Sequence, residues 1–212
     1  MFRWIVVLHL FVVGSALAGD GNSGKQAPAD RIADEPGVAM LFGQHYFFGL
    51  EAPDGWVLDN TSGAAQGLDA VFYLKGSSWK AFDPVIYPQV WQKEGSTLAS
   101  VIQQDIANYR QHSPSVEVEE RPVVKTAVGA TASLRHFRGS QNKTFEAIAY
   151  FDEPNVVVMI VLSAKSKASF ESAQPAFRQL LDSYKFVGEF ERLPESDKQS
   201  AAPVRPARYH AH

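Results

Sequence analysis

Residues 156–162 read Val-Val-Val-Met-Ile-Val-Leu, seven consecutive apolar side chains. Because successive side chains of a strand point to opposite faces, this run is apolar on both faces. A strand of that kind is typical of the centre of a sheet that is covered on both sides. We therefore expect residues 156–162 to form a central strand, with covering layers supplied by the rest of the chain.

The sequence before this run predicts further strands. The Glu-Pro-Asn sequence at 153–155 predicts a hairpin turn into it, and the Pro-Asp-Gly sequence at 53–55 predicts a turn that passes the chain to a strand from Trp56. Proline cannot donate to a strand ladder, so Pro88 places its strand at an edge or a bulge. The other predicted strands span residues 45–51, 70–75, 85–92, 116–125, 130–138 and 143–151.

Two segments predict amphipathic helices. The first begins after a capping hydroxyl at Ser96 or Thr97, and Pro114 closes it. Its apolar residues at helical spacing are Leu98, Val101, Ile102, Ile106 and Tyr109. The second helix spans about residues 167–184, with an apolar stripe of Phe170, Phe177, Leu180, Leu181 and Tyr184. Strands, one helix, more strands and a closing helix predict an α+β fold with a mainly antiparallel sheet covered by helices.

The first 18 residues have the pattern of a secretory signal peptide. Arg3 precedes the apolar run of residues 4–13, and the small residues at 14–18 predict cleavage after Ala18. The run is shorter than the ~20 apolar residues that a membrane-spanning helix needs. We therefore expect a periplasmic or secreted protein with no stable membrane span after cleavage.

The remaining chain divides into three predicted parts. Gly, Asp, Ala and Pro dominate the segment after the signal, so we expect a flexible leader over residues 19–43. One α+β domain is expected over residues 44–188, and a disordered, Pro-containing tail over residues 189–212. The chain carries a formal net charge of −3 and no basic run, which disfavours nucleic acid as a partner.

The order of these segments resembles a known fold family. The resemblance lies in the order of four segments: the Pro-Asp-Gly-Trp turn at 53–56, the helix at 98–109, the strand block, and the closing Leu-Leu-Asp-Ser-Tyr-Lys-Phe at 180–186. In this order the chain resembles the PsbP-like fold, and within it the bacterial DcrB-like envelope proteins. The resemblance covers residues 44–188. It implies an α-β-α sandwich and a non-catalytic role, because members are extrinsic photosystem subunits, envelope proteins and secretion-effector chaperones. It implies no shared site.

Catalytic signatures are absent from the sequence. The chain has no cysteine, which removes disulfides, thiolate chemistry and a lipid-acceptor cysteine. It also lacks the Gly-x-Ser-x-Gly elbow of α/β-hydrolases and the His-Glu-x-x-His motif of zinc proteases. His136 lies among alternating apolar residues, which is typical of a packed histidine. We expect no catalytic residue and no cofactor.

Aromatic residues offer the main candidate for partner binding. They are Trp79, Phe82, Tyr87 and Trp91, on two neighbouring segments that also contribute to the core. Filling of the core is the favoured interpretation for most of them, and Trp79 and Trp91 are the candidate exceptions. Asn60 and Asn142 begin glycosylation patterns, which matter only in a eukaryotic secretory pathway.

Metal binding is a weaker candidate function. His210 and His212 place two imidazoles near the terminal carboxylate, a combination that suits zinc, copper or nickel. Glu117, Glu119 and Glu120 could bind a hard cation, but strand alternation puts Glu120 on the opposite face, so a solvated strand is favoured. No metal is expected as a resident cofactor.

Taken together, these observations predict an exported, non-enzymatic accessory domain whose partner is another envelope or secreted protein. Two alternatives remain open. One is a hydrolase whose site is assembled from distant residues such as His136 and neighbouring carboxylates. The other is a metal-handling protein that acts through the histidine tail.

Overall fold

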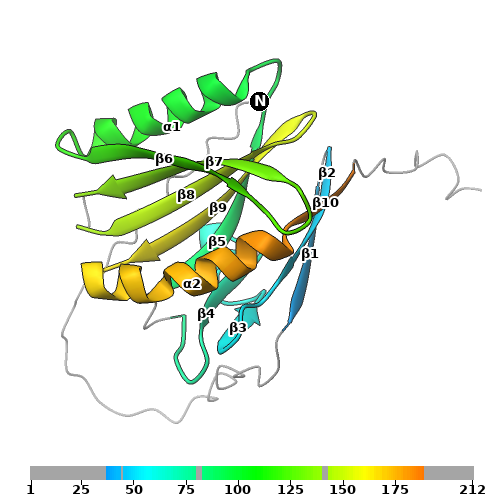
Figure 1. Ribbon diagram of the computed structural model, residues 1–212, viewed down its shortest axis with the longest axis vertical. Helices are drawn as coiled ribbons and strands as arrows, with labels where there is room; N and C mark the ends of the chain where they lie inside the picture. Colours follow the sequence, from blue (N-terminus) through cyan, green and yellow to red (C-terminus); the bar gives the residue numbers. More distant parts are fainter. Residues whose placement is uncertain (1–36, 44, 80–82, 140–142, 189–212) are drawn as a thin grey trace, which may run out of the picture.

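The computed structural model describes residues 37–43, 45–79, 83–139 and 143–188 (Figure 1). The predicted signal peptide with its cleavage site at Ala18 lies outside the described residues, as do the tail with His210 and His212, Phe82 and Asn142. The strands are β1 Val38–Gly43, β2 Tyr46–Glu51, β3 Trp56–Asp59, β4 Val71–Leu74, β5 Val85–Gln92, β6 Glu117–Lys125, β7 Thr131–Arg138, β8 Phe145–Asp152, β9 Val156–Ala164 and β10 Lys185–Gly188. The helices are α1 Leu98–His112, α2 Lys167–Ser183 and the short 3-10 turn η1 Ala64–Gln66.

A seven-stranded sheet forms the body of the molecule. Its strand order is β3-β4-β5-β9-β8-β7-β6, and every neighbouring pair is antiparallel. The apolar strand β9 lies in the middle, between β5 and β8, and all nine of its residues are buried. The prediction of a central strand covered on both sides is confirmed.

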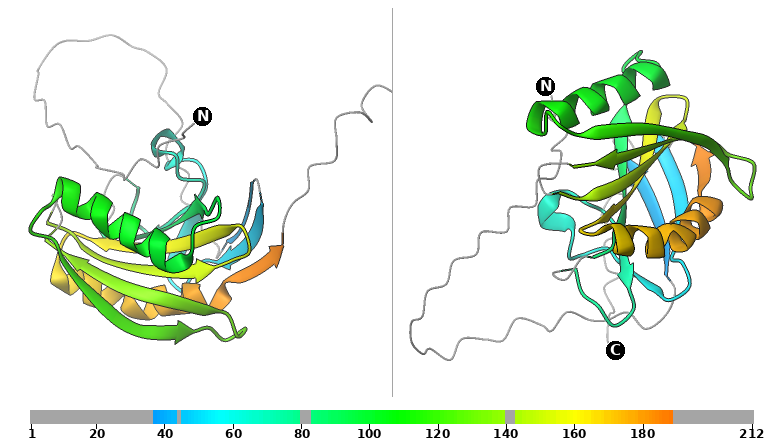
Figure 2. Two further views of the ribbon diagram at one scale, coloured as in Figure 1. Left: turned by 90° about the horizontal axis from the view of Figure 1, so that it is seen from above. Right: turned by 60° about the vertical axis from the view of Figure 1, so that its left-hand side comes forward.

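The two helices cover opposite faces of this sheet (Figure 2). Val158, Ile160 and Leu162 of β9 pack in one apolar cluster with α2, whereas Val157, Met159 and Val161 pack in another with α1. The predicted α+β class, with a mainly antiparallel sheet between helices in an α-β-α arrangement, is confirmed. Neither described helix is long and apolar enough to cross a membrane.

A second, three-stranded sheet of order β1-β2-β10 adjoins α2 (Figure 1). Ala39 and Leu41 of β1 and Phe48 and Leu50 of β2 pack in the same apolar cluster as α2. The inner face of the small sheet is therefore continuous with the main core.

The strand β1 corrects the predicted boundary between leader and domain. Residues 38–43, which the sequence analysis placed in the flexible leader, pair with β2 along the whole register from Val38↔Glu51 to Gly43↔Tyr46. The pairing is favourable because it buries Ala39 and Leu41 against the core. The strand β10 was also unexpected: the chain continues after α2 as a strand that pairs with β2.

Pro88, which has no N–H to donate, lies where one side of β5 pairs with no described strand. Pro88 pairs with Ile160 on the β9 side of β5. On the other side, β4 pairs only with Val85 and Ile86, so within the described residues that edge of β5 is open at Pro88. The prediction of an edge position therefore holds for this half of the strand.

Candidate binding surface

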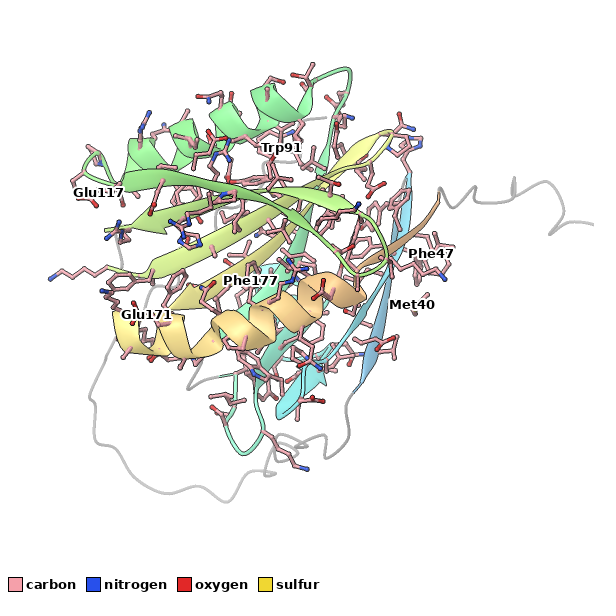
Figure 3. All side chains as sticks on the ribbon, in the orientation of Figure 1. Met40, Phe47, Trp91, Glu117, Glu171 and Phe177 are labelled. Carbon is pink, nitrogen blue, oxygen red and sulfur yellow. The ribbon has the colours of Figure 1, made fainter. Side chains whose placement is uncertain are left out.

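The structure places the predicted aromatic residues as packed side chains. Trp79 is only 9% exposed and lies in an apolar cluster with Val57, Val71 and other residues of β3 and β4. Tyr87 and Trp91 are half-buried and pack against the cluster beneath α1; Figure 3 labels Trp91. Tyr87 also contacts the Trp79 cluster, so it joins the two. The role of these residues in partner binding stays a prediction.

A different surface, the outer apolar face, exposes large apolar side chains. We define it by Val38, Met40 and Phe42 of β1, Phe47 of β2 and Val187 of β10. Four of them are exposed, Val38 by 61%, Met40 by 50%, Phe42 by 66% and Val187 by 53%, and Phe47 is half-buried. Met40 and Phe47 project away from the body of the molecule (Figure 3).

Strand register brings these side chains together. Met40 lies opposite Gly49, and Phe42 lies opposite Phe47, so the four positions share one face of the sheet. Gly49 has no side chain, and the Met40 sulfur lies 3.2 Å from the place a Cβ would take there. Any larger residue at position 49 would therefore displace Met40.

The apolar exposure is concentrated on this sheet. Of the other described residues, Leu74, Val123 and Val128 are the exposed large apolar side chains, and they lie on three different segments. Single exposed apolar residues are normal on a soluble protein, whereas a cluster of them is typical of an interaction site.

The edge strand β6 is protected from pairing with another chain. Its sequence, Glu-Val-Glu-Glu-Arg-Pro-Val-Val-Lys, contains five charged residues, a proline and an irregularity of register between Arg121 and Val124. Charges, proline and bulges are the usual devices that prevent an edge from pairing with another chain.

The edge strand β1 has none of these devices. Its sequence is Val-Ala-Met-Leu-Phe-Gly, six residues without charge or proline. The remaining outer strands, β3 and β10, have four residues each, and a short edge is itself a protection. Within the described residues β1 pairs only with β2, so its second edge offers backbone groups beside the outer apolar face.

This surface was not predicted from the sequence, because the segment next to it has the composition of a flexible leader. The segment before residue 38 is rich in Gly, Asp, Ala and Pro, and the leader was extended through residue 43. The signal that could have found it is the alternation at 38–43, with larger side chains on one face at Val38, Met40 and Phe42.

His136 does not converge with the buried carboxylates. It lies on the α2 face of β7, where its ring meets Phe170 edge to face at 5.3 Å. Burial, and then the charge of Arg121, lower its pKa, and among the described residues its buried Nε2 has no hydrogen-bond partner. The buried acids Asp105 and Glu146 lie in the layer beneath α1, on the other side of the sheet. His136 therefore does not meet these two acids. Its cross-strand neighbour is the exposed Glu119, which accepts from Arg121, and the hydrolase alternative stays a hypothesis.

The acidic residues of β6 are solvated, as expected. Glu119 accepts a hydrogen bond from Arg121 at 2.7 Å, and Glu120, on the opposite face, lies 3.2 Å from Arg135. In the described part of the chain no three or more His, Cys, Asp or Glu side chains come together as a potential metal site.

Comparisons with known proteins concern the fold. No family model matches the chain, and no curated protein matches it in sequence. Among solved structures it is similar to cyanobacterial PsbP (CyanoP) from Synechocystis, at 12% identity and a TM-score of 0.44, covering 76% of this chain and 97% of that one.

Two further structures are similar to a comparable degree. LpqN, involved in cell envelope biogenesis of Mycobacterium tuberculosis, has 14% identity and a TM-score of 0.47, with coverage of 77% of this chain and 99% of that one. The Ran-binding protein Mog1p of Saccharomyces cerevisiae has 11% identity and a TM-score of 0.46, with coverage of 71% and 95%. The narrower likeness to DcrB-like proteins stays a prediction from the sequence.

Proposed function

We propose that this protein is an exported, non-catalytic accessory domain that binds another protein through the outer apolar face. The observation that carries the proposal is the combination, on β1, of three exposed apolar side chains and an uncharged edge that pairs with no other strand of the described residues. A protein that meets both features removes apolar surface from water and pairs the free backbone groups of the edge.

The chemistry of β1 selects the kind of partner. Within the described residues, the edge of β1 away from β2 pairs with no other strand, and its N–H and C=O groups can form a regular ladder only with an extended backbone. Side chains across such a pairing lie close together, so apolar residues at every second position of the partner would contact Val38, Met40 and Phe42. The partner is therefore an extended segment of another envelope or secreted protein, apolar at alternate positions and uncharged at its centre.

The first 18 residues support export to the periplasm or the extracellular space. The test is the intact mass of the protein recovered from its own cells. A mature chain that begins at Gly19 is the expected result. A full-length chain retained inside the cell would overturn export without bearing on the binding surface.

Site-specific photo-crosslinking in the native compartment tests the binding surface. A photoreactive residue at position 38 should form one discrete product, and the added substitution Met40→Glu should abolish that product. Val123→Glu is the matched control, because Val123 is also an exposed residue of an edge strand but lies on the protected β6. The control should leave the product unchanged.

Three outcomes would contradict the proposed partner. One is the absence of any product at position 38 in a correctly localised protein. Another is a product with twice the mass of this chain, which would assign the face to a second copy. A product that survives Met40→Glu would show that the outer apolar face does not determine binding.

A further inference from the structure

A buried polar network joins α1 to the large sheet, on the face opposite to α2. It contains two carboxylates, Asp105 of α1 and Glu146 of β8, which are only 6% and 9% exposed. The apolar residues around them include Val101, Ile106 and Val161. Buried carboxylates are costly unless they are hydrogen-bonded, paired with a cation or protonated.

Asp105 is connected to the sheet by one strong hydrogen bond. The hydroxyl of Tyr150, from β8, donates to Asp105 Oδ2 at 2.6 Å. Both side chains are buried. The bond therefore attaches the middle of α1 directly to a central strand.

Glu146 is held by three hydroxyl groups. Tyr109, one helical turn after Asp105, donates to Glu146 Oε2, while Thr144 and Ser163 each donate to Oε1 at 3.0 Å. The Tyr109 ring also stacks on Phe137 at 4.3 Å. The helix is thus attached to the sheet at two points, and each attachment ends on a carboxylate.

No cation neutralises these carboxylates within the described residues. The groups that face them are Tyr87 from β5, Tyr109 from α1 and Tyr150 from β8, and burial raises the pKa of all three tyrosines, so they stay protonated. A basic group on β7, Arg135, acts on Tyr150, and its guanidinium lies 3.2 Å from the carboxylate of Glu120.

Burial, reinforced by the charge of Glu146, raises the pKa of Asp105 from about 3.8 to about 6, and the hydrogen bond from Tyr150 offsets only part of this rise. Asp105 therefore gains its charge within the range of ordinary environmental pH. That charge appears in an apolar layer beside a second carboxylate.

We propose that α1 is the pH-responsive element of this fold: it docks most firmly on the sheet when Asp105 is protonated, and it opens before the rest of the molecule when that proton is lost. The opening separates Asp105 and Tyr109 from their partners on β8 and transfers the acid to water. It also exposes the apolar face of α1 and the sheet residues beneath it, including Val157 and Met159. The helix α2, which buries no charged side chain, does not share this response.

Hydrogen exchange measured by mass spectrometry on the mature chain tests the proposal. After correction for the intrinsic exchange rates, the opening constant of residues 101–109 should increase on the order of 20-fold between pH 4.5 and pH 7.5, because an acid with a folded pKa near 6 and an open-state pKa near 3.8 favours opening as pH rises. The amides of α2 should change much less.

Two variants assign the response to Asp105. Asp105→Asn should remove most of the pH dependence at α1, because the amide can still accept from Tyr150 but does not ionise. Tyr150→Phe should move the response to higher pH, because it removes the hydrogen bond that favours the charged form. The control Glu171→Gln changes an exposed carboxylate of α2 whose ion-pair partner is Lys167, and it should leave the response intact.

The wild-type profile is decisive even where a variant fails to fold. An opening constant of α1 that does not change with pH, or that changes in parallel with that of α2, would overturn the proposal. So would an Asp105→Asn variant that folds and keeps the wild-type response.

Discussion

The two faces of the seven-stranded sheet are each covered by one helix, α1 of 15 residues and α2 of 17, but they are stabilised differently. On the α2 face, Ile160, Leu162 and Leu180 are completely buried among apolar neighbours. On the α1 face, apolar residues share the layer with Asp105 and Glu146. Because apolar burial does not depend on protonation, the packing of α2 does not depend on the protonation of an acid, while on the α1 face stability depends on the charge state of Asp105.

The largest expected effect is the loss of packing on the α2 face. Leu180→Ala removes a completely buried side chain and should lower the free energy of unfolding by about 3–5 kcal/mol, from lost burial and the cavity left behind. Ile106→Ala on the α1 face, where the side chain is less completely buried, should cost about 2 kcal/mol. Urea denaturation measures both values. Equal losses of unfolding free energy in Leu180→Ala and Ile106→Ala would contradict tighter packing on the α2 face than on the α1 face.

A second effect sharpens the comparison through pH. The folded pKa of Asp105, about 6, lies above the ordinary value of 3.8, so the folded state holds its proton more tightly than the unfolded state. The contribution of this proton to stability is complete below pH 3.8 and is lost as pH rises through 6, a total of about 3 kcal/mol at 1.36 kcal/mol per pKa unit.

Denaturation of the wild type and of Asp105→Asn at pH 4 and pH 8 measures this effect together with the coupling of Asp105 to Glu146, because the carboxylates that do not interact with Asp105 contribute equally to both proteins. The variant should gain stability relative to wild type as pH rises. A difference between the two proteins that stays constant with pH would mean that Asp105 ionises normally in the folded protein.

Tyrosine hydroxyls that donate to carboxylates provide a third comparison. Tyr109→Phe removes one donor from buried Glu146 and should cost about 1–2 kcal/mol, because no water replaces it there. Tyr184→Phe removes the 2.8 Å bond to Glu153, which is half-buried and can be solvated, and should cost less than about 1 kcal/mol. Chemical denaturation of both variants at one pH compares their losses of stability. A larger loss for Tyr184→Phe than for Tyr109→Phe would contradict the deeper burial of Glu146.

The smallest difference between the two faces is expected at the helix caps, where the two helices should behave alike. Thr97 accepts from the Ser100 N–H at 3.2 Å, and Ser166 accepts from the Ser169 N–H at 3.0 Å. Replacement of either cap by alanine should cost about 1 kcal/mol, because each leaves one helical N–H without its side-chain partner. Thermal or urea unfolding of the two variants should give similar losses, and a large inequality would show that the helices depend unequally on local capping.

The sequence predicted the order of most elements because their signals are local. The double-sided apolar run of β9, the cap at Thr97 and the stripe of α2 each depend on residues within one element, and the structure confirms all three. The strand β1 was missed because six alternating residues are a weak signal beside a segment rich in Gly and Pro.

The candidate surfaces could not be predicted in the same way. Tyr73 lies in an apolar strand segment and Trp79 follows a Gly-Ser-Ser loop, and only the fold shows that both lie in one cluster. Met40 belongs to a short alternation at 38–43, and its exposure follows from the packing of Ala39 and Leu41 against the core, which turns Met40 to the opposite face of the small sheet.

By itself, the sequence determined that this chain forms an α+β domain with a central apolar strand and two amphipathic helices. Periodicity and capping act over a few residues, and they can therefore be recognised without the fold. Only the tertiary structure decided that Asp105 meets Tyr150 across 45 positions of sequence, that Glu146 receives three hydroxyls, and that the outer apolar face lies beside an unprotected edge. These features depend on which distant segments become neighbours, because burial and pairing are properties of the assembled fold.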